Sequence, residues 1–274
     1  MQYDPIKRSL GKVFNQSPAL RIFFYRLLDL LLLRAWYIRR ELRKIARENK
    51  NTLQVLDAGS GFGQYDYYMA SIVKNWNITA VDVKQEQIDD CNHFFNRIKL
   101  GDRVHFEYAD LTRYTQSESY DLILSVDVME HILEDEVVFH NFYQSMKKNA
   151  TLIISTPSDQ GGSDAHHHHD DEEGVHGFID EHVRDGYNAD DIREKLERAG
   201  FKNIRTQYTY GKPGNLSWRL SMKYPIKALN ASKLFFVLLP FYYLLFYPVA
   251  YLLNWVDISQ QHTKGTGLMV VAQK

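Results

Sequence analysis

The sequence has 274 residues, enough for one elaborated domain or two small ones, and its single cysteine, Cys91, excludes an internal disulfide and a cysteine-based zinc cluster. The formal net charge of -1 hides an asymmetry, because basic segments at 1–50 and 212–274 flank an acidic body. Both basic segments are rich in leucine and phenylalanine, which favours an anionic lipid surface over nucleic acid as the partner.

A basic helix is expected over residues 18–48, where leucine, arginine, glutamate and alanine dominate and proline stands at the start. Four charged residues interrupt its apolar run, so we do not expect a membrane span: Arg21, Arg26, Asp29 and Arg34. The helix is either an anchor at a membrane interface or a cap on the domain body. We treat 1–50 as a segment of its own. Because its start lacks the apolar core of a signal peptide, we expect a cytoplasmic protein.

From residue 53 onward, short β-branched runs alternate with helical stretches. The runs expected to form strands are 53–59, 77–83, 104–110, 120–126, 151–156, 201–210 and 267–273. Strands that alternate with helices are typical of an α/β fold with a parallel sheet covered on both faces. Asn188 is expected to begin the helix before the sixth run, and Gly200 to end it.

The run "VLDAGSGFGQY" places Asp57, Gly59, Gly61 and Gly63 at alternating positions directly after the first expected strand. Glycines there let the backbone turn sharply and approach a ligand that a β-carbon would exclude. A glycine-rich turn leading from a strand into a helix is typical of a nucleotide-type site in an open α/β sheet. Taken alone, these glycines also fit a tight turn without a ligand.

The ends of the next strands carry further polar residues. Asp82 ends the second strand, where a carboxylate can accept hydrogen bonds from ribose hydroxyls, and Asp110 ends the third. The fourth strand leads into "DVMEHI" at the same edge of the sheet. This series resembles the class I S-adenosylmethionine-dependent methyltransferases, and in particular the ubiquinone and menaquinone biosynthesis group. A dinucleotide-binding dehydrogenase would instead have G-x-G-x-x-G spacing.

The resemblance implies a Rossmann-like, seven-stranded, mostly parallel sheet with an antiparallel last strand. It implies a methyltransferase domain of residues 51–211 and 264–274, with a basic, apolar helical insertion at 212–263 between the last two strands. The cofactor would be S-adenosylmethionine, with the glycines at its methionine and ribose, Asp82 at the ribose, Asp110 at the adenine, and the carbonyl of Ser125 at the methionine amino group. The implied cofactor-binding residues are Asp57, Gly59, Gly61, Gly63, Asp82, Val83, Asp110, Leu111 and Ser125.

In "DVMEHI", the spacing of Asp127, Glu130 and His131 would bring them together on the first turn of a helix. The string resembles E-x-x-E-H of the quinone-biosynthesis O-methyltransferases, where such residues can hold a divalent cation, with Asp127 in place of the first glutamate. A close Glu-His pair is also frequent in this superfamily without a metal. In that case Glu130 and His131 are candidate catalytic residues of the substrate pocket, with His131 as a general base.

The loop after the fifth strand contains a run of histidines and acids, His166–Glu173. Consecutive residues do not point the same way, so we expect an exposed polar loop, and loops of this length often act as lids. Farther along, "EHVRDGY" resembles the H-x-R-x-(F/Y) lead-in to the next helix in relatives of the quinone methyltransferases. This resemblance makes His182 a third candidate catalytic residue, lining the pocket.

The run "LFFVLLPFYYLLFYPVAYLLNWV", residues 234–256, carries no charged residue and is long enough to cross a bilayer. However, the strands before and after it are expected to pair in one sheet, so both ends must lie on the same side of any membrane. Pro240 and Pro248 are expected to divide the run into short helical pieces. Lysines, an arginine and interfacial aromatic residues accompany the run, which favours a segment lying on a membrane. A dimer interface and a cap on the N-terminal helix are the alternatives.

We therefore expect a methyltransferase, peripheral or monotopic on the cytoplasmic membrane face, that methylates a lipid-like or amphiphilic acceptor, with oxygen preferred as the accepting atom. One alternative is a soluble small-molecule methyltransferase whose insertion forms a homodimer interface. Another is a non-catalytic membrane-binding module on the same scaffold. The intact cofactor residues from Asp57 to Asp110 favour an enzyme, because a scaffold has no need of them.

Overall fold

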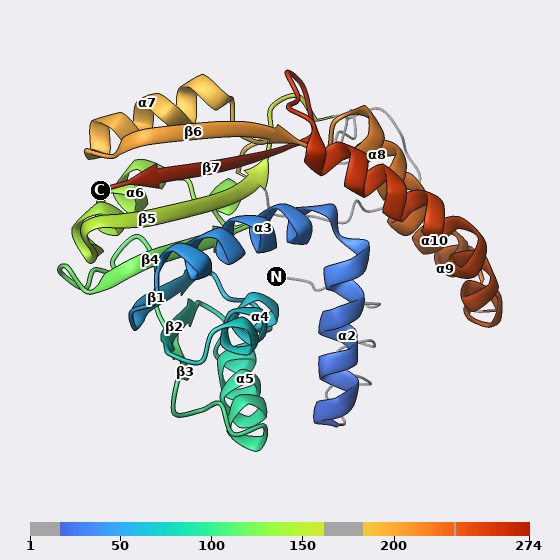
Figure 1. The fold of residues 1–274 in the computed structure, drawn as a ribbon, viewed down its shortest axis with the longest axis horizontal. Coiled ribbons are helices and arrows are strands. Elements are labelled where there is room, and N and C mark those ends of the chain that lie inside the picture. The colour runs from blue at the N-terminus through green and yellow to red at the C-terminus, as the bar shows by residue number, and fades with distance from the viewer. Residues whose placement is uncertain (1–16, 162–182, 233) are drawn as a thin grey trace.

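The sheet predicted from the sequence is present in the computed structural model, which describes residues 17–161, 183–232 and 234–274. Seven strands form one sheet in the order β3-β2-β1-β4-β5-β7-β6 (Figure 1). The strands are β1 (Leu53–Ala58), β2 (Trp76–Asp82), β3 (Val104–Tyr108), β4 (Tyr120–Val126), β5 (Met146–Pro157), β6 (Lys202–Thr209) and β7 (Gly267–Gln273). Strand β7 runs antiparallel to both of its neighbours and all other pairs are parallel, which confirms the predicted fold class.

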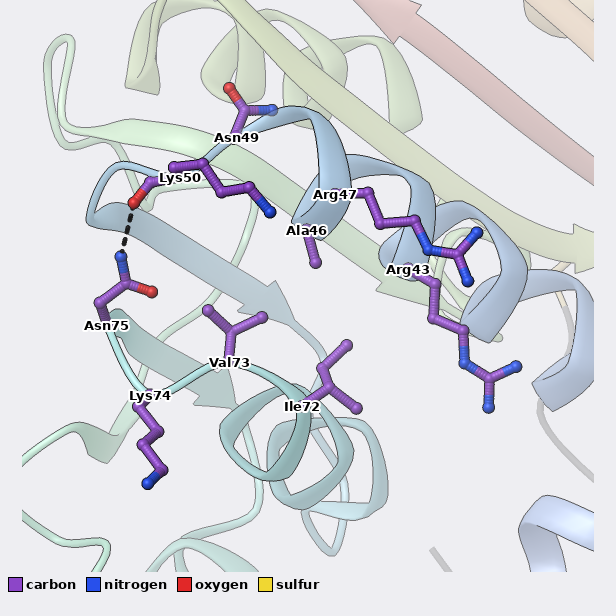
Figure 2. Close-up of a pocket in the computed structure, with 9 residues that line it drawn as sticks. All are labelled: Arg43, Ala46, Arg47, Asn49, Lys50, Ile72, Val73, Lys74 and Asn75. Carbon is purple, nitrogen blue, oxygen red and sulfur yellow. Dashed lines mark hydrogen bonds between the residues drawn. The ribbon is translucent and has the colours of Figure 1, made fainter.

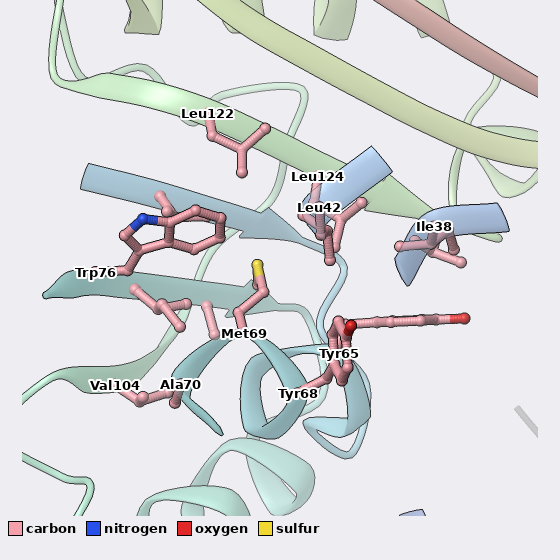
Figure 3. Close-up of a cluster of buried hydrophobic side chains, with 14 of the residues drawn as sticks. Ile38, Leu42, Tyr65, Tyr68, Met69, Ala70, Trp76, Val104, Leu122 and Leu124 are labelled. Carbon is pink, nitrogen blue, oxygen red and sulfur yellow. The ribbon is translucent and has the colours of Figure 1, made fainter. Parts of the chain in front are cut away.

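Helices cover both faces of this sheet. These are α3 (Leu33–Glu48), α4 (Gln64–Ile72) and α5 (Gln85–Arg97) on one face, and α6 (Asp135–Ser145) and α7 (Ala189–Ala199) on the other. Leu122 and Leu124 pack toward the first group of helices, whereas Ile123 between them packs toward the second. This alternation is that of a strand buried on both sides. Figure 3 shows the first core, where Leu42 of α3 and Met69 of α4 meet the strands.

The helix predicted over residues 18–48 is in fact two helices. Helix α2 (Pro18–Leu31) ends at Leu32, whose backbone is extended (φ -91°, ψ 111°), and α3 starts in a new direction (Figure 1). No glycine or proline marks the break. Because of this break, α3 packs on the sheet through Ile38 and Leu42. Helix α2 instead contacts the start of α4, where Gln64 Nε2 donates to Asp29 Oδ1 at 2.9 Å. The sequence left open whether this segment anchors the protein at a membrane interface or caps the domain body, and α3 is a cap on the domain body.

The insertion between β6 and β7 is a helical hairpin that projects from the sheet (Figure 1). Its outgoing arm comprises α8 (Lys212–Trp218), the π-helical turn η2 (Arg219–Lys223) and α9 (Tyr224–Ala231), and its returning arm is α10 (Phe235–Ser259). The prediction that Pro240 and Pro248 break the apolar run was wrong, because both lie inside the continuous helix α10. Within the described residues, α10 is the one helix long and apolar enough to cross a membrane, and only 6% of its most apolar stretch is buried.

Tyrosine hydroxyl groups join the two arms where the outgoing arm lacks helical hydrogen bonds. Pro225 has no N–H group, so the carbonyl of Ser221 four residues earlier needs another donor, and Tyr243 Oη donates to it at 2.9 Å. In the π-helical turn, the N–H of Tyr224 donates to the carbonyl of Arg219 five residues earlier, and Tyr242 Oη donates to the carbonyl of Leu220 at 2.8 Å. These contacts hold the two arms of the hairpin together.

Candidate functional site

The glycine-rich loop lies between β1 and α4, at the carboxyl edge of the sheet. Gly59, Gly61 and Gly63 all have positive φ (87°, 55° and 81°), a region that side chains rarely adopt. A β-carbon on Gly59 would lie 2.2 Å from Val128, whereas one on Gly61 would have no atom within 4 Å. The loop is therefore closely packed at Gly59 and open at Gly61. A ligand could approach the backbone closely at Gly61.

Asp82 holds this loop in place. Its Oδ2 accepts from the N–H of Gly61 at 2.9 Å and its Oδ1 from the N–H of Lys84 at 3.0 Å. The next residue, Val83, is half exposed. A carboxylate at the end of β2, beside an open glycine turn, has the chemistry to accept hydrogen bonds from ribose hydroxyls.

The other predicted cofactor residues lie at the ends of the neighbouring strands. Asp110 follows β3, and its Oδ1 accepts from both the N–H and the Oγ1 of Thr112, which lowers the pKa of the carboxyl group. Leu111 is buried beside it, and Ser125 near the end of β4 is fully buried. The structure therefore brings the predicted set to one edge of one sheet, next to an open loop, and these residues fit S-adenosylmethionine.

The structure does not assemble Asp127, Glu130 and His131 as a metal site. Among the described residues, no three His, Cys, Asp or Glu side chains are placed to hold a metal ion. Glu130 is buried in the 3₁₀ turn η1 (Met129–His131), where its Oε2 accepts from Thr156 Oγ1 at 3.0 Å, while His131 is exposed. Burial and the nearby charge of Asp127 raise the pKa of Glu130 to about 8.

Asp127 itself pairs with a residue that the sequence analysis did not assign to the site. Its carboxylate forms an ion pair with Arg34 of α3, whose backbone N–H donates to Tyr210 Oη at 3.1 Å. Asp127 has positive φ (52°), which is uncommon outside glycine and recurs at functional sites. Tyr65, two residues after the glycine loop, is buried where the charges of Arg34 and Asp127 both act on it. These four residues, far apart in the sequence, form a cluster at the same edge of the sheet.

Comparison with known proteins identifies the family. A family model described as a methyltransferase domain matches residues 33–206. The chain belongs to the methyltransferase domain family. The predicted class I S-adenosylmethionine-dependent methyltransferase, with this methyl donor as cofactor, is thereby confirmed.

Relatives with curated names are more distant. The chain is 27% identical over 104 residues to a ubiquinone biosynthesis O-methyltransferase of Rickettsia prowazekii (38% of this chain, 40% of that protein). It is 31% identical over 163 residues to phosphoethanolamine N-methyltransferase 1 of Arabidopsis thaliana (55% of this chain, 29% of that protein). The chain spans less than half the length of the curated relatives it matches.

Solved structures show the same fold. A phosphoethanolamine N-methyltransferase 2 from Haemonchus contortus, in complex with S-adenosyl-L-methionine, has a TM-score of 0.61 at 16% identity over 97% of this chain and 59% of that one. A Galdieria sulphuraria protein described as a putative sarcosine dimethylglycine methyltransferase has a TM-score of 0.56 at 15% identity, over 88% and 85%.

Below its glycine loop, the methyltransferase buries two carboxyl groups against each other. Asp57 is the second-last residue of β1 and Asp66 lies in the first turn of α4, and both are almost completely excluded from solvent. Burial raises the pKa of Asp57 to about 7, and burial together with Asp57 raises the pKa of Asp66 well above its usual value. Asp57 was expected at the cofactor, and the structure shows that its carboxyl group also faces a second acid.

Replacing Asp66 with asparagine should therefore stabilise the protein at alkaline pH. A raised pKa means that the folded state holds more protons than the unfolded state between about pH 4 and pH 7, so the free energy of unfolding falls as pH rises through that window. The amide removes one titrating group and can donate to Asp57. We expect a gain of about 2 kcal/mol at pH 8 and little change at pH 4, measured by urea unfolding. Parallel pH profiles for the two proteins would contradict the pairing.

The segment that follows the long loop secures the turn after β4 of the methyltransferase. Arg184 forms an ion pair with Asp135 and donates to the carbonyl of Ile132 at 2.6 Å, and Tyr187 Oη donates to Asp135 Oδ2 at 2.7 Å. Arg184 and Tyr187 of "EHVRDGY" thus position η1, although Tyr187 lies one residue beyond the aromatic position of the H-x-R-x-(F/Y) pattern, which is Gly186. His182 and His166–Glu173 lie outside the described residues.

A separate surface hollow of about 390 Å³ lies at the opposite edge of the sheet (Figure 2). It lies where α3 and α4 end, before β1 and β2 begin. Its cationic lining residues are Arg43, Arg47, Lys50 and Lys74. Cations at the carbonyl ends of two helices are stabilising without any ligand, so we do not assign the cofactor to this hollow.

Proposed function

We propose that this methyltransferase works at an anionic membrane surface, on its cytoplasmic face, and methylates a lipid-like or amphiphilic acceptor, with oxygen preferred as the accepting atom. The observation that carries the proposal is the exposed apolar stripe of α10. The most exposed side chains of this stripe are Val237, Phe241, Leu244, Leu245, Leu252 and Trp255.

The stripe lies on a helix that is apolar over most of its surface. Ala250, Asn254 and Asp257, on the opposite face of α10, are buried against the rest of the protein. The outgoing arm adds the exposed cations Lys212, Arg219 and Lys227. A large exposed apolar face marks an interaction surface, and cations beside it favour an anionic bilayer as the partner.

The hairpin starts at the edge of the sheet that carries the predicted cofactor residues. Strand β6 runs antiparallel to β7, which runs antiparallel to β5, so β6 ends at the same edge as β1 and β4. Tyr210 follows β6, accepts from the backbone of Arg34 and directly precedes the hairpin. An acceptor drawn from a membrane along the hairpin would therefore reach the edge where Asp127 lies.

In the proposed reaction, different residues of the chain would bind the cofactor and accept a proton from the acceptor. S-adenosylmethionine supplies an electrophilic methyl group on its sulfonium. Asp82 and Asp110 would bind the cofactor, and alignment of the acceptor with the methyl group would provide most of the rate enhancement. A hydroxyl acceptor also needs a proton acceptor, for which Glu130, His131 and His182 are the proposed candidates. A divalent cation at Asp127, Glu130 and His131 would require these side chains to move together.

Charging the stripe should abolish membrane binding. In the double variant Leu244→Asp/Leu245→Asp, lost burial and added charge should lower partitioning by about a hundredfold or more. Flotation with vesicles of phosphatidylcholine and phosphatidylglycerol measures this. The matched control, Leu133→Asp/Val137→Asp, changes two exposed apolar residues on another part of the surface. Equal flotation of both variants would contradict the role of α10.

A transfer assay tests the acceptor. Methyl-labelled S-adenosylmethionine is incubated with the protein and a cell extract, and the label is separated between organic and aqueous phases. Label in the organic phase supports a lipid-like acceptor. Label in the aqueous phase alone, with a dimer that the charged variant dissociates, would replace the membrane with a second copy of the chain.

A further inference from the structure

Helix α2 contacts the glycine-rich loop directly, and we propose that its Arg21 is a positioning residue for the cofactor. Arg21 would hold the loop in the shape that receives S-adenosylmethionine. The inference rests on the methyl donor of the proposed function and is independent of the acceptor and the membrane. Helix α2 lies outside residues 33–206, so the family match does not include this contact.

Arg21 is only 3% exposed, and its hydrogen bonds converge on the loop region. Its Nη2 donates to the carbonyl of Phe62 at 2.8 Å, and its Nη1 to Asp90 of α5. Its Nε donates to Tyr25 Oη at 2.7 Å, and the guanidinium carbon lies 4.4 Å from the centre of the Phe94 ring. A buried guanidinium is costly unless its donors are satisfied, and here a loop carbonyl satisfies one of them.

The carbonyl that Arg21 holds lies at the most adaptable part of the loop. Phe62 stands between Gly61 and Gly63, which both have positive φ. Tyr25 Oη donates to the same carbonyl, and the Tyr25 ring lies 5.7 Å from the Phe62 ring. Two donors and a ring contact from one helix thus fix the orientation of a peptide unit flanked by glycines.

Fixing this peptide unit matters because glycines leave a loop many conformations. A ligand that binds such a loop must order it, and a contact that orders the loop beforehand lowers that cost. A second contact links α2 to the residue directly after the loop, because Gln64 Nε2 at the start of α4 donates to Asp29 Oδ1 at 2.9 Å. Together, these contacts indicate that α2 preorganises the cofactor loop.

The test is the affinity for S-adenosylhomocysteine, measured by calorimetry on the full chain, which needs no acceptor. Arg21→Gln should weaken binding by about ten- to a hundredfold, with a less favourable binding entropy, because the loop is then ordered only on binding. Arg21→Lys keeps the positive charge but lacks the planar, forked donors of the guanidinium, so it should bind more tightly than Arg21→Gln and more weakly than the wild type. Arg26→Gln, on the exposed side of the same helix, is the matched control and should bind like the wild type.

Tyr25→Phe removes one hydroxyl group and keeps the ring, so it tests the same carbonyl if Arg21→Gln does not fold. It should weaken binding by about threefold to tenfold, with faster hydrogen exchange at Gly61 and Gly63. A folded Arg21→Gln or Tyr25→Phe protein with wild-type affinity and exchange would overturn the inference. Wild-type binding without label transfer would count against the proposed acceptor alone, whereas absence of wild-type binding would overturn both the donor and this inference.

Discussion

Asp82→Ala should weaken the binding of S-adenosylhomocysteine by at least about a hundredfold, because each hydrogen bond to a charged carboxylate contributes about 1.5–3 kcal/mol. The change also removes the acceptor for the N–H of Gly61, so the loop would lose its anchor on β2. Calorimetry measures the affinity.

The control for this experiment is Asp102→Ala, which removes an exposed carboxylate from the turn before β3. Urea unfolding of both variants separates loss of the site from loss of the fold, and we expect Asp82→Ala to cost only about 1 kcal/mol of stability. If the affinity stayed within a few-fold of the wild type, Asp82 would have to be removed from the cofactor site.

Asp257→Ala should lower the free energy of unfolding by about 3–5 kcal/mol, because it leaves several buried donors unsatisfied. Asp257 is fully buried at the end of α10. Tyr37 Oη donates to its Oδ1 at 2.7 Å, the N–H of Gly214 donates to its Oδ2 at 2.9 Å, and His262 Nε2 lies 3.2 Å from Oδ2. One side chain thus joins the two arms of the hairpin to α3.

Urea unfolding of Asp257→Ala, with Asp102→Ala as the exposed control, measures this effect. Asp257→Asn keeps one acceptor oxygen and should lose less. A wild-type midpoint for Asp257→Ala would show that other contacts suffice, such as that of Arg40 Nη1 with the carbonyl of Ile258 at 2.6 Å.

Elements specified by local sequence were predictable, whereas those specified by partners were not. The β-branched runs, the glycines after β1 and the caps at Asn188 and Gly200 depend on near neighbours, and each appears as expected. The break at Leu32 has no local signal, since its cause is that α2 and α3 pack on different parts of the domain. In α10 the local signal was misleading, because the helix runs through both of its prolines.

The same distinction applies to the site. Asp82, Asp110 and Ser125 could be placed because the carboxyl ends of parallel strands meet at one edge. The ion pair between Arg34 and Asp127 could not be placed in this way, because no pattern in the sequence connects the two residues. In the sequence, Arg34 is marked only as a charge that interrupts an apolar run, and its ion pair with Asp127 depends on the fold rather than on a local signal.

The place of the hairpin in the chain bears on how such an enzyme can change. Thr209 at the end of β6 pairs with Gly267 at the start of β7, so the insertion begins and ends at paired positions of the sheet. Loop-closure entropy grows slowly with length, by about 0.6 kcal/mol for each doubling. A change in the length of the arms therefore has little effect on the free energy of forming the sheet and its cofactor edge. Asp257 and its partners fix the root of the hairpin, and Tyr247 and Tyr251 tie the returning arm to α2 and α3. The parts of the arms beyond these contacts can lengthen, shorten or acquire new side chains, so the preferred surface and acceptor can diverge while the transfer chemistry is kept.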